Sequence, residues 1–126
     1  MWHSILLISS GAAIGATMRW ALGIWLNPIF NMLAFGTLMA NYLGCFIIGI
    51  LTALFGQFPT FSQSAKLFLI TGFLGSLTTF SSFSAEVMEN LVNGKITESL
   101  WVLGLHVIGC LVCTFIGIYL TVMVLK

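Results

Sequence analysis

The residues with the greatest capacity for chemistry lie together in one mostly apolar stretch. From Thr71 to Ser84 the sequence reads T-G-F-L-G-S-L-T-T-F-S-S-F-S, with seven hydroxyl side chains, two glycines and three phenylalanines among fourteen residues. Each glycine costs about 1 kcal/mol in a helix relative to alanine, and clustered Ser and Thr compete for backbone hydrogen bonds. We therefore predict a helix that breaks near Gly75–Thr79, where freed carbonyl groups can bind a cation. The alternative is a continuous helix that its Ser and Thr residues kink.

Phe80 and Phe83 follow the predicted break and are three residues apart, so they share one helical face. The edges of aromatic rings are electropositive, and two such edges can line a path for a small anion. A phenylalanine pair is equally typical of ordinary packing, so the pair alone does not decide between the two interpretations.

Arg19 lies within the first apolar segment, where a charge is costly unless it faces protein or water. Gly11, Gly15, Arg19 and Gly23 recur every four residues, which predicts that Arg19 lies on a small-residue face packed against another helix. The guanidinium then either attracts anions or anchors the helix at the membrane surface.

Two further polar tracks repeat every four residues. Thr37, Asn41 and Cys45 form the first, and an amide such as that of Asn41 can bond either to an anion or to a neighbouring helix. The second track consists of His106, Cys110 and Thr114.

Composition places these residues in a membrane. The 126 residues are 60% hydrophobic and 6% charged, whereas a soluble domain carries about 25% charged residues. This excludes a soluble enzyme and a disordered segment, and a net charge of +1 offers no basic patch for nucleic acid. No nucleophile–base pair, phosphate loop or metal-ligand spacing is present in the sequence, so we do not expect an enzyme. The apolar runs are continuous rather than alternating, which favours an all-α integral membrane protein over a β-barrel.

A single transmembrane domain of four helices accounts for the whole length, because about 20 apolar residues span a bilayer. The apolar runs cover approximately residues 4–26, 33–55, 66–90 and 99–125. Basic residues are divided evenly: Lys66 and Lys126 lie toward one side, Arg19 and Lys95 toward the other. The positive-inside rule, by which the side richer in Lys and Arg faces the cytoplasm, therefore does not predict an orientation for this chain. Either lipid or one decisive charge fixes the topology, or the chain inserts both ways and forms an antiparallel homodimer, which we favour because four helices rarely enclose a conduit.

Two motifs resemble those of the bacterial fluoride channel family (Fluc, also called CrcB). They are G-T-L-M-A-N-Y-L-G-C-F at 36–46 and G-F-L-G-S-L-T-T-F-S-S-F-S at 72–84, and the G-A-x-x-R pattern ending at Arg19 fits as well. The resemblance covers the whole chain. It implies a dual-topology homodimer with two pores in the bacterial inner membrane, which exports fluoride passively and selectively and so limits its toxicity.

The resemblance also implies roles for individual residues. The carbonyl groups of Gly75 and Thr78 would hold a structural sodium ion, not transported, at the dimer centre. The family commonly carries tyrosine and serine where this chain has His106 and Cys110. Because a thiol is a weak hydrogen-bond donor, Thr114 is the safer assignment as an anion-binding residue in that track. The expected ion pathway comprises Arg19, Thr37, Asn41, Phe80, Ser81, Phe83, Ser84, His106 and Thr114.

Two other functions remain open from the sequence. A proton-coupled antiporter resembling the small multidrug exporters would need an acid in the first membrane segment, where this chain has Arg19, and Glu86 is the remaining candidate. A non-transporting scaffold subunit is the second alternative, but the many polar groups of the third segment would be costly for such a role.

Overall fold

The computed structural model describes residues 1–29 and 33–126, and the regular structure within them is helical. Four segments are long and apolar enough to cross a membrane, which confirms the predicted number: Trp2–Ile29, Phe35–Gln57, Gln63–Val92 and Ile96–Leu125. The second helix begins at Phe35 rather than at residue 33. The third and fourth segments begin three residues earlier than their apolar runs. Helical backbone hydrogen bonding extends through polar residues such as Gln63 and Glu98, which hydropathy alone leaves out of a membrane segment.

The segments consist of eight labelled elements within the described residues. The first contains α1 (Trp2–Leu26) and the short 3-10 turn η1 (Asn27–Ile29). The second is α2 (Phe35–Gln57), and the fourth is α6 (Ile96–Leu125). The third is composite, with α3 (Gln63–Lys66), the π-helical η2 (Leu67–Leu74), α4 (Gly75–Leu77) and α5 (Phe80–Val92).

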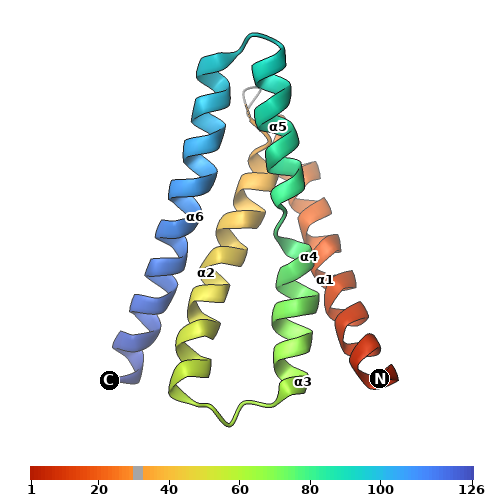
Figure 1. Cartoon of the computed structure of the whole chain (residues 1–126), viewed down its shortest axis with the longest axis vertical. Coiled ribbons are helices and arrows are strands. Elements are labelled where there is room, and N and C mark those ends of the chain that lie inside the picture. The colour runs from red at the N-terminus through yellow and green to blue at the C-terminus, as the bar shows by residue number, and fades with distance from the viewer. Residues whose placement is uncertain (30–32) are drawn as a thin grey trace.

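Both chain termini and the α2–α3 connection lie at one end of the molecule, and the α5–α6 connection lies at the other (Figure 1). This is the arrangement expected for four consecutive membrane crossings. α2 packs along α6, whereas α1 packs along η2 and α4. α1 also packs directly against α2, and α5 packs against α6, so the third segment contacts α1 with its first half and α6 with its second.

The small-residue face of α1 packs against the third segment as predicted. A Cβ atom placed on Gly11 would lie 2.5 Å from the carbonyl oxygen of Phe68, and one on Gly15 would overlap the carbonyl oxygen of Phe73. Such close approach of two backbones requires residues without side chains. Arg19 lies two turns beyond Gly11 on this face, and its Nε donates to the carbonyl oxygen of Ser76 at 2.9 Å.

The third segment breaks at Thr78 and Thr79, within the predicted range. Both residues are extended, with ψ of 155° at Thr78 and a φ,ψ pair of −150°, 122° at Thr79. Gly75 itself remains helical, with φ −60° and ψ −28°. The π-helical η2 precedes the break, and π-helical turns are frequent at functional sites.

Candidate ion-binding cavity

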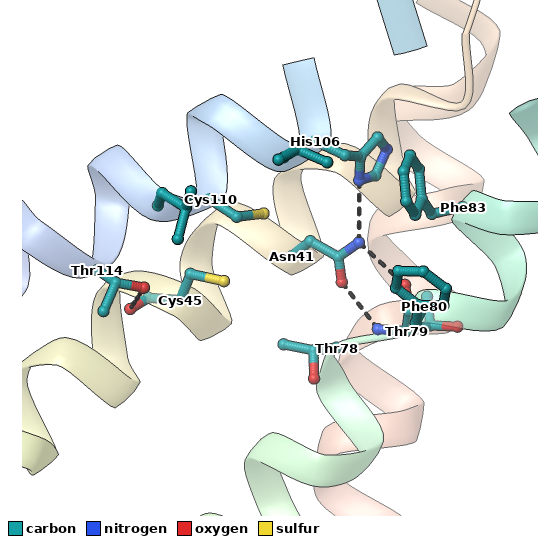
Figure 2. Close-up of a pocket in the computed structure, with 11 residues that line it drawn as sticks. Asn41, Cys45, Thr78, Thr79, Phe80, Phe83, His106, Cys110 and Thr114 are labelled. Carbon is teal, nitrogen blue, oxygen red and sulfur yellow. Dashed lines mark hydrogen bonds between the residues drawn. The ribbon is translucent and has the colours of Figure 1, made fainter. Parts of the chain in front are cut away.

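A cavity of about 390 Å³ lies beside the break (Figure 2). We call it the central cavity, and its walls come from α2, α5, α6 and the break itself. It is lined by Asn41, Cys45, Thr78, Thr79, Phe80, Phe83, His106, Val107, Cys110, Leu111 and Thr114. None of these lining residues carries a formal charge, so dipoles and polarised edges set its electrostatic character.

The buried side chain of Asn41 joins α2 to the break. Its Oδ1 accepts a hydrogen bond from the Thr79 N–H at 2.8 Å, and its Nδ2 donates to the Thr79 carbonyl oxygen at 3.1 Å. Nδ2 also lies 3.1 Å from Nδ1 of His106. The Thr79 N–H is a donor, so it must face the amide oxygen of Asn41 and not the amide nitrogen. This contact fixes the orientation of the Asn41 amide.

Asn41 and Thr79 together keep the helix open at this point. In an uninterrupted helix, the N–H groups of Thr79 and Ser82 would bond to the carbonyl groups of Gly75 and Thr78. Here the Thr79 N–H bonds to Asn41, and the Ser82 N–H bonds to the Thr79 hydroxyl at 3.2 Å, which caps α5. The carbonyl groups of Gly75 and Thr78 have therefore lost their usual helical donors.

The two phenylalanines of the cavity contact each other edge to face. Their ring centroids are 5.3 Å apart, with an angle of 76° between the ring planes. Phe83 is 5% exposed and lies 4.5 Å from the His106 ring, whereas Phe80 is 76% exposed. Although both rings line the cavity, only that of Phe83 is enclosed by its own chain.

The α6 side of the cavity is a row of mixed polarity. His106 is 4% exposed, and its Nε2 is buried without a hydrogen-bond partner among the described residues. The Thr114 hydroxyl donates to the Cys45 carbonyl oxygen at 3.1 Å. Between them, the thiols of Cys45 and Cys110 are free and point toward the cavity (Figure 2).

Comparison with known proteins assigns this architecture to a family. Residues 6–118 match the family described as CrcB-like protein, Camphor Resistance (CrcB). The chain belongs to the CrcB family. A CrcB relative from Mannheimia succiniciproducens, named fluoride-specific ion channel FluC, is 59% identical over 121 residues, which are 96% of this chain and 95% of the relative.

Other relatives carry the same name. Proteins from Haemophilus influenzae (strain PittGG) and Pasteurella multocida (strain Pm70), also named fluoride-specific ion channel FluC, are 56% and 54% identical over 118 residues. In both cases the match covers 94% of this chain and 92% of the relative. With four apolar helices and these relatives, the CrcB chain is a multi-pass membrane protein.

The cavity of this CrcB chain contains part of the residue set expected from the sequence. It unites Asn41, Phe80, Phe83, His106 and Thr114, and it adds Thr78 from the expected cation site. Thr37, Ser81, Ser84, Arg19 and Gly75 lie outside its lining. The expected roles of all these residues in ion passage or cation binding, inside and outside the lining, remain predictions.

The residues outside the lining have contacts of their own. Arg19 donates to the Ser76 carbonyl oxygen, and the Ser81 hydroxyl lies 3.2 Å from that of Thr79. Thr37 lines a second cavity of about 520 Å³, which also includes Glu86. One carboxylate oxygen of Glu86 accepts the Ala34 N–H at 2.7 Å.

Sequence reasoning assigned no site role to Thr79 or Cys45, both of which line the central cavity. Cys45 was placed in the polar track of Asn41, which it follows by four residues on the same helical face, but it was given no role in ion passage. Thr79 had a weaker signal: it ends the predicted break, and threonine is one of the residue types that commonly cap a helix N-terminus.

Proposed function

We propose that this chain is a fluoride-selective channel that carries fluoride passively out of the bacterial cell across the inner membrane. The observation that carries the proposal is the identity of 52–59% over nearly the whole chain with proteins named fluoride-specific ion channels. The match covers 95% of the Mannheimia succiniciproducens relative, so the similarity extends over nearly the whole length of that channel. The proposal makes the protein a channel rather than an enzyme.

The central cavity has the chemistry that a small anion requires. Thr79 caps the N-terminus of α5, so the positive end of that helix dipole faces the cavity lining. The edge-to-face pair of Phe80 and Phe83 offers polarised ring hydrogens. No carboxylate is among the lining residues to repel an anion.

Fluoride selectivity follows from spacing and weak donors. Fluoride is small and strongly hydrated, so a pore must replace its water with several close donors, which a larger halide cannot approach in the same way. Conduction also requires that the ion leave each site, and ring edges bind weakly enough to allow this.

The assembly that we propose is an antiparallel homodimer with two pores, each built from both copies. Two observations support it. The four basic residues are divided evenly between the two sides of the membrane, and Phe80 is 76% exposed although it lines the cavity of one copy. A second copy would cover that ring and complete the pore wall.

A structural sodium ion at the centre of this dimer fits the break. Sodium binds oxygen ligands, and unwound carbonyl groups in membrane helices provide them. The donors that would occupy the Gly75 and Thr78 carbonyls bond instead to Asn41 and Thr79. Gly75 and Thr78 of each copy would hold the ion, which would supply charge that stabilises the dimer centre and would not itself be transported.

Ion flux from liposomes containing the purified protein tests the function. We expect rapid fluoride efflux, little chloride efflux, and loss of both activity and dimer when sodium is replaced by a large organic cation. Chloride efflux equal to that of fluoride would overturn the proposal.

The same liposomes test the coupled-antiporter alternative, which would use Glu86. One oxygen of that carboxylate is buried without a hydrogen-bond partner among the described residues, as a proton site could be. Fluoride efflux at equal pH on both sides, unchanged in a Glu86→Gln variant, would exclude proton coupling. An absence of any selective flux would instead favour a scaffold.

A further inference from the structure

Two thiols lie together on one wall of the central cavity. Cys45 on α2 and Cys110 on α6 both line the cavity, and neither is in a disulfide. The Cys110 side chain makes a hydrogen bond with that of Cys45. Both sulfur atoms point into the cavity (Figure 2). The passage of fluoride does not require sulfur here, because a thiol is a weak hydrogen-bond donor.

The close packing of α2 against α6 holds the two thiols in this arrangement. A Cβ atom on Gly49 would overlap the carbonyl oxygen of Thr114, so the two helix backbones are nearly in contact. The Thr114 hydroxyl, one turn beyond Cys110, donates to the Cys45 carbonyl oxygen at 3.1 Å. A ligand that needs both sulfur atoms therefore finds them already positioned, and its binding orders few groups.

The number and type of these ligands select a soft metal ion. Among residues 1–29 and 33–126, no group of three or more His, Cys, Asp or Glu side chains could hold a metal ion, so a four-coordinate zinc site is not formed there. Two sulfur ligands are suited instead to Cu⁺ and Ag⁺, soft ions that commonly bind two ligands in a line. Hard cations prefer oxygen, and no carboxylate lines the cavity.

We propose that Cys45 and Cys110 form a two-coordinate site for a soft monovalent cation such as Cu⁺ or Ag⁺, and that an ion bound there blocks the passage of fluoride. The blocking role rests on the proposed function, whereas the binding role does not. On binding, one S–H bond breaks, a metal–sulfur bond forms and the proton passes to water. The second sulfur donates a lone pair and keeps its hydrogen, so nothing is oxidised or reduced.

The charge of the complex fits the cavity. One thiolate and one monovalent cation cancel, and a neutral complex avoids the cost of a free charge in a lining that carries none. The positive end of α5 begins at Thr79 and does not repel such a complex. Cys110 lies between His106 and Thr114 in the α6 row, so a metal ion held there lies within the expected ion pathway.

Silver is the probe for the blocking role, because silver fluoride dissolves in water whereas silver chloride precipitates. Fluoride efflux is measured from liposomes in a chloride-free nitrate solution, with silver on both sides. We expect the block to follow occupancy of the site, so that silver at about ten times its dissociation constant reduces fluoride efflux about tenfold. An excess of a small thiol, which competes for silver, should restore the efflux.

Silver binding by the solubilised protein gives the dissociation constant and identifies the ligands without a flux measurement. A titration should show one tight site per chain, and X-ray absorption at the silver edge should show two sulfur neighbours. Cys45→Ser and Cys110→Ser should each lose both the tight site and the block. Cys113→Ser changes the third cysteine of the chain, which is outside the cavity lining, and as the matched control it should retain both.

The outcomes distinguish this site from the function of the channel. Wild-type liposomes that fail to prefer fluoride before silver is added would remove the proposed function, and the silver titration would still decide the metal site. A silver block that persists in both Cys45→Ser and Cys110→Ser, or tight silver binding with unchanged fluoride efflux, would overturn the inference. If a serine variant at either position does not fold, the Cys113→Ser protein decides, because fewer than two sulfur neighbours around its silver would exclude the pair as ligands.

Discussion

The two halves of the third membrane segment are held in place by different forces. Before the break, η2 and α4 contact α1 through backbone atoms, with Gly15 against the Phe73 carbonyl, and the Ser76 hydroxyl lies 2.9 Å from the Ala12 carbonyl oxygen. After the break, side-chain hydrogen bonds hold α5 at its start and near its middle. Asn41 binds Thr79 at its start, and the Ser99 hydroxyl donates to the Val87 carbonyl oxygen at 2.9 Å.

The two halves therefore have different roles: the first packs tightly against α1, and the second presents side chains to the central cavity. Close backbone packing fixes the first half, and it leaves no room for a side chain at Gly11, Gly15 or Gly72. The second half carries Phe80 and Phe83 into the cavity while a few polar contacts set its position. A segment built in this way can present ion-binding groups in the membrane because the neighbouring half supplies the stable packing.

The largest effect on stability and fluoride flux is expected from replacing Asn41, which holds the start of the second half. In Asn41→Leu the Thr79 N–H and C=O would both lose their partner inside the protein, and each unsatisfied buried group costs about 1–3 kcal/mol. We expect a lower unfolding temperature in detergent and no fluoride flux in liposomes. A Tyr42→Phe variant, which also removes a hydrogen bond from α2 to α6 but not to the break, is the control. Equal losses in the two variants would contradict a special role for the break.

Packing of the first half is tested at Gly15. The added methyl group of Gly15→Ala would overlap the Phe73 carbonyl oxygen, and overpacking of this kind costs about 1–3 kcal/mol. We expect a lower unfolding temperature, with fluoride selectivity unchanged in whatever protein remains folded. Gly104→Ala on α6 is the matched control, because a Cβ there meets nothing within 4 Å, and it should be neutral or slightly stabilising. A Gly15→Ala protein as stable as the Gly104→Ala protein would show that the α1 contact yields easily.

The sequence is sufficient to predict what local composition controls. Glycines every four residues in α1 indicate a close helix contact, and glycine with clustered hydroxyls indicates a break. Which residues within the predicted range Gly75–Thr79 are extended could not be predicted, because this depends on a hydrogen bond between Asn41 and Thr79, which are 38 residues apart. For the same reason, the contact of the Asn41 amide with Nδ1 of His106, 65 residues away, could not be predicted.

Periodicity also fails to separate residues that share a face. Phe80 and Phe83 lie on the same side of α5, yet one is exposed and the other buried. The difference arises from α6, which covers Phe83 with His106 and leaves the first turn of α5 open. Sequence patterns give the face of a helix, whereas burial depends on where the neighbouring helix passes.

Within the second half, Phe80 and Phe83 should differ in their effect on stability but not in their effect on fluoride flux. Isoleucine has no polarised edge, so Phe80→Ile and Phe83→Ile should each reduce fluoride flux, by up to about tenfold for a lost aromatic edge contact. Only Phe83→Ile should also lower the unfolding temperature of the solubilised protein, since Phe83 is 5% exposed and Phe80 is 76% exposed. Unchanged flux in both variants would remove the rings from the mechanism.

The smallest effect is expected at Cys110, where the chain carries a thiol in the polar row of α6. A hydroxyl donates hydrogen bonds more strongly than a thiol, so Cys110→Ser should change fluoride flux by only a few-fold, and toward faster passage. Its side chain points toward the central cavity, whereas Cys113 on the same helix is outside the cavity lining (Figure 2). Cys113→Ser therefore makes the same chemical change away from the pathway and should leave the flux unaltered. If the two serine variants give the same fluoride flux in liposomes, the side chain at position 110 does not contact the ion. The ion contacts are then confined to the break, the phenylalanines and His106.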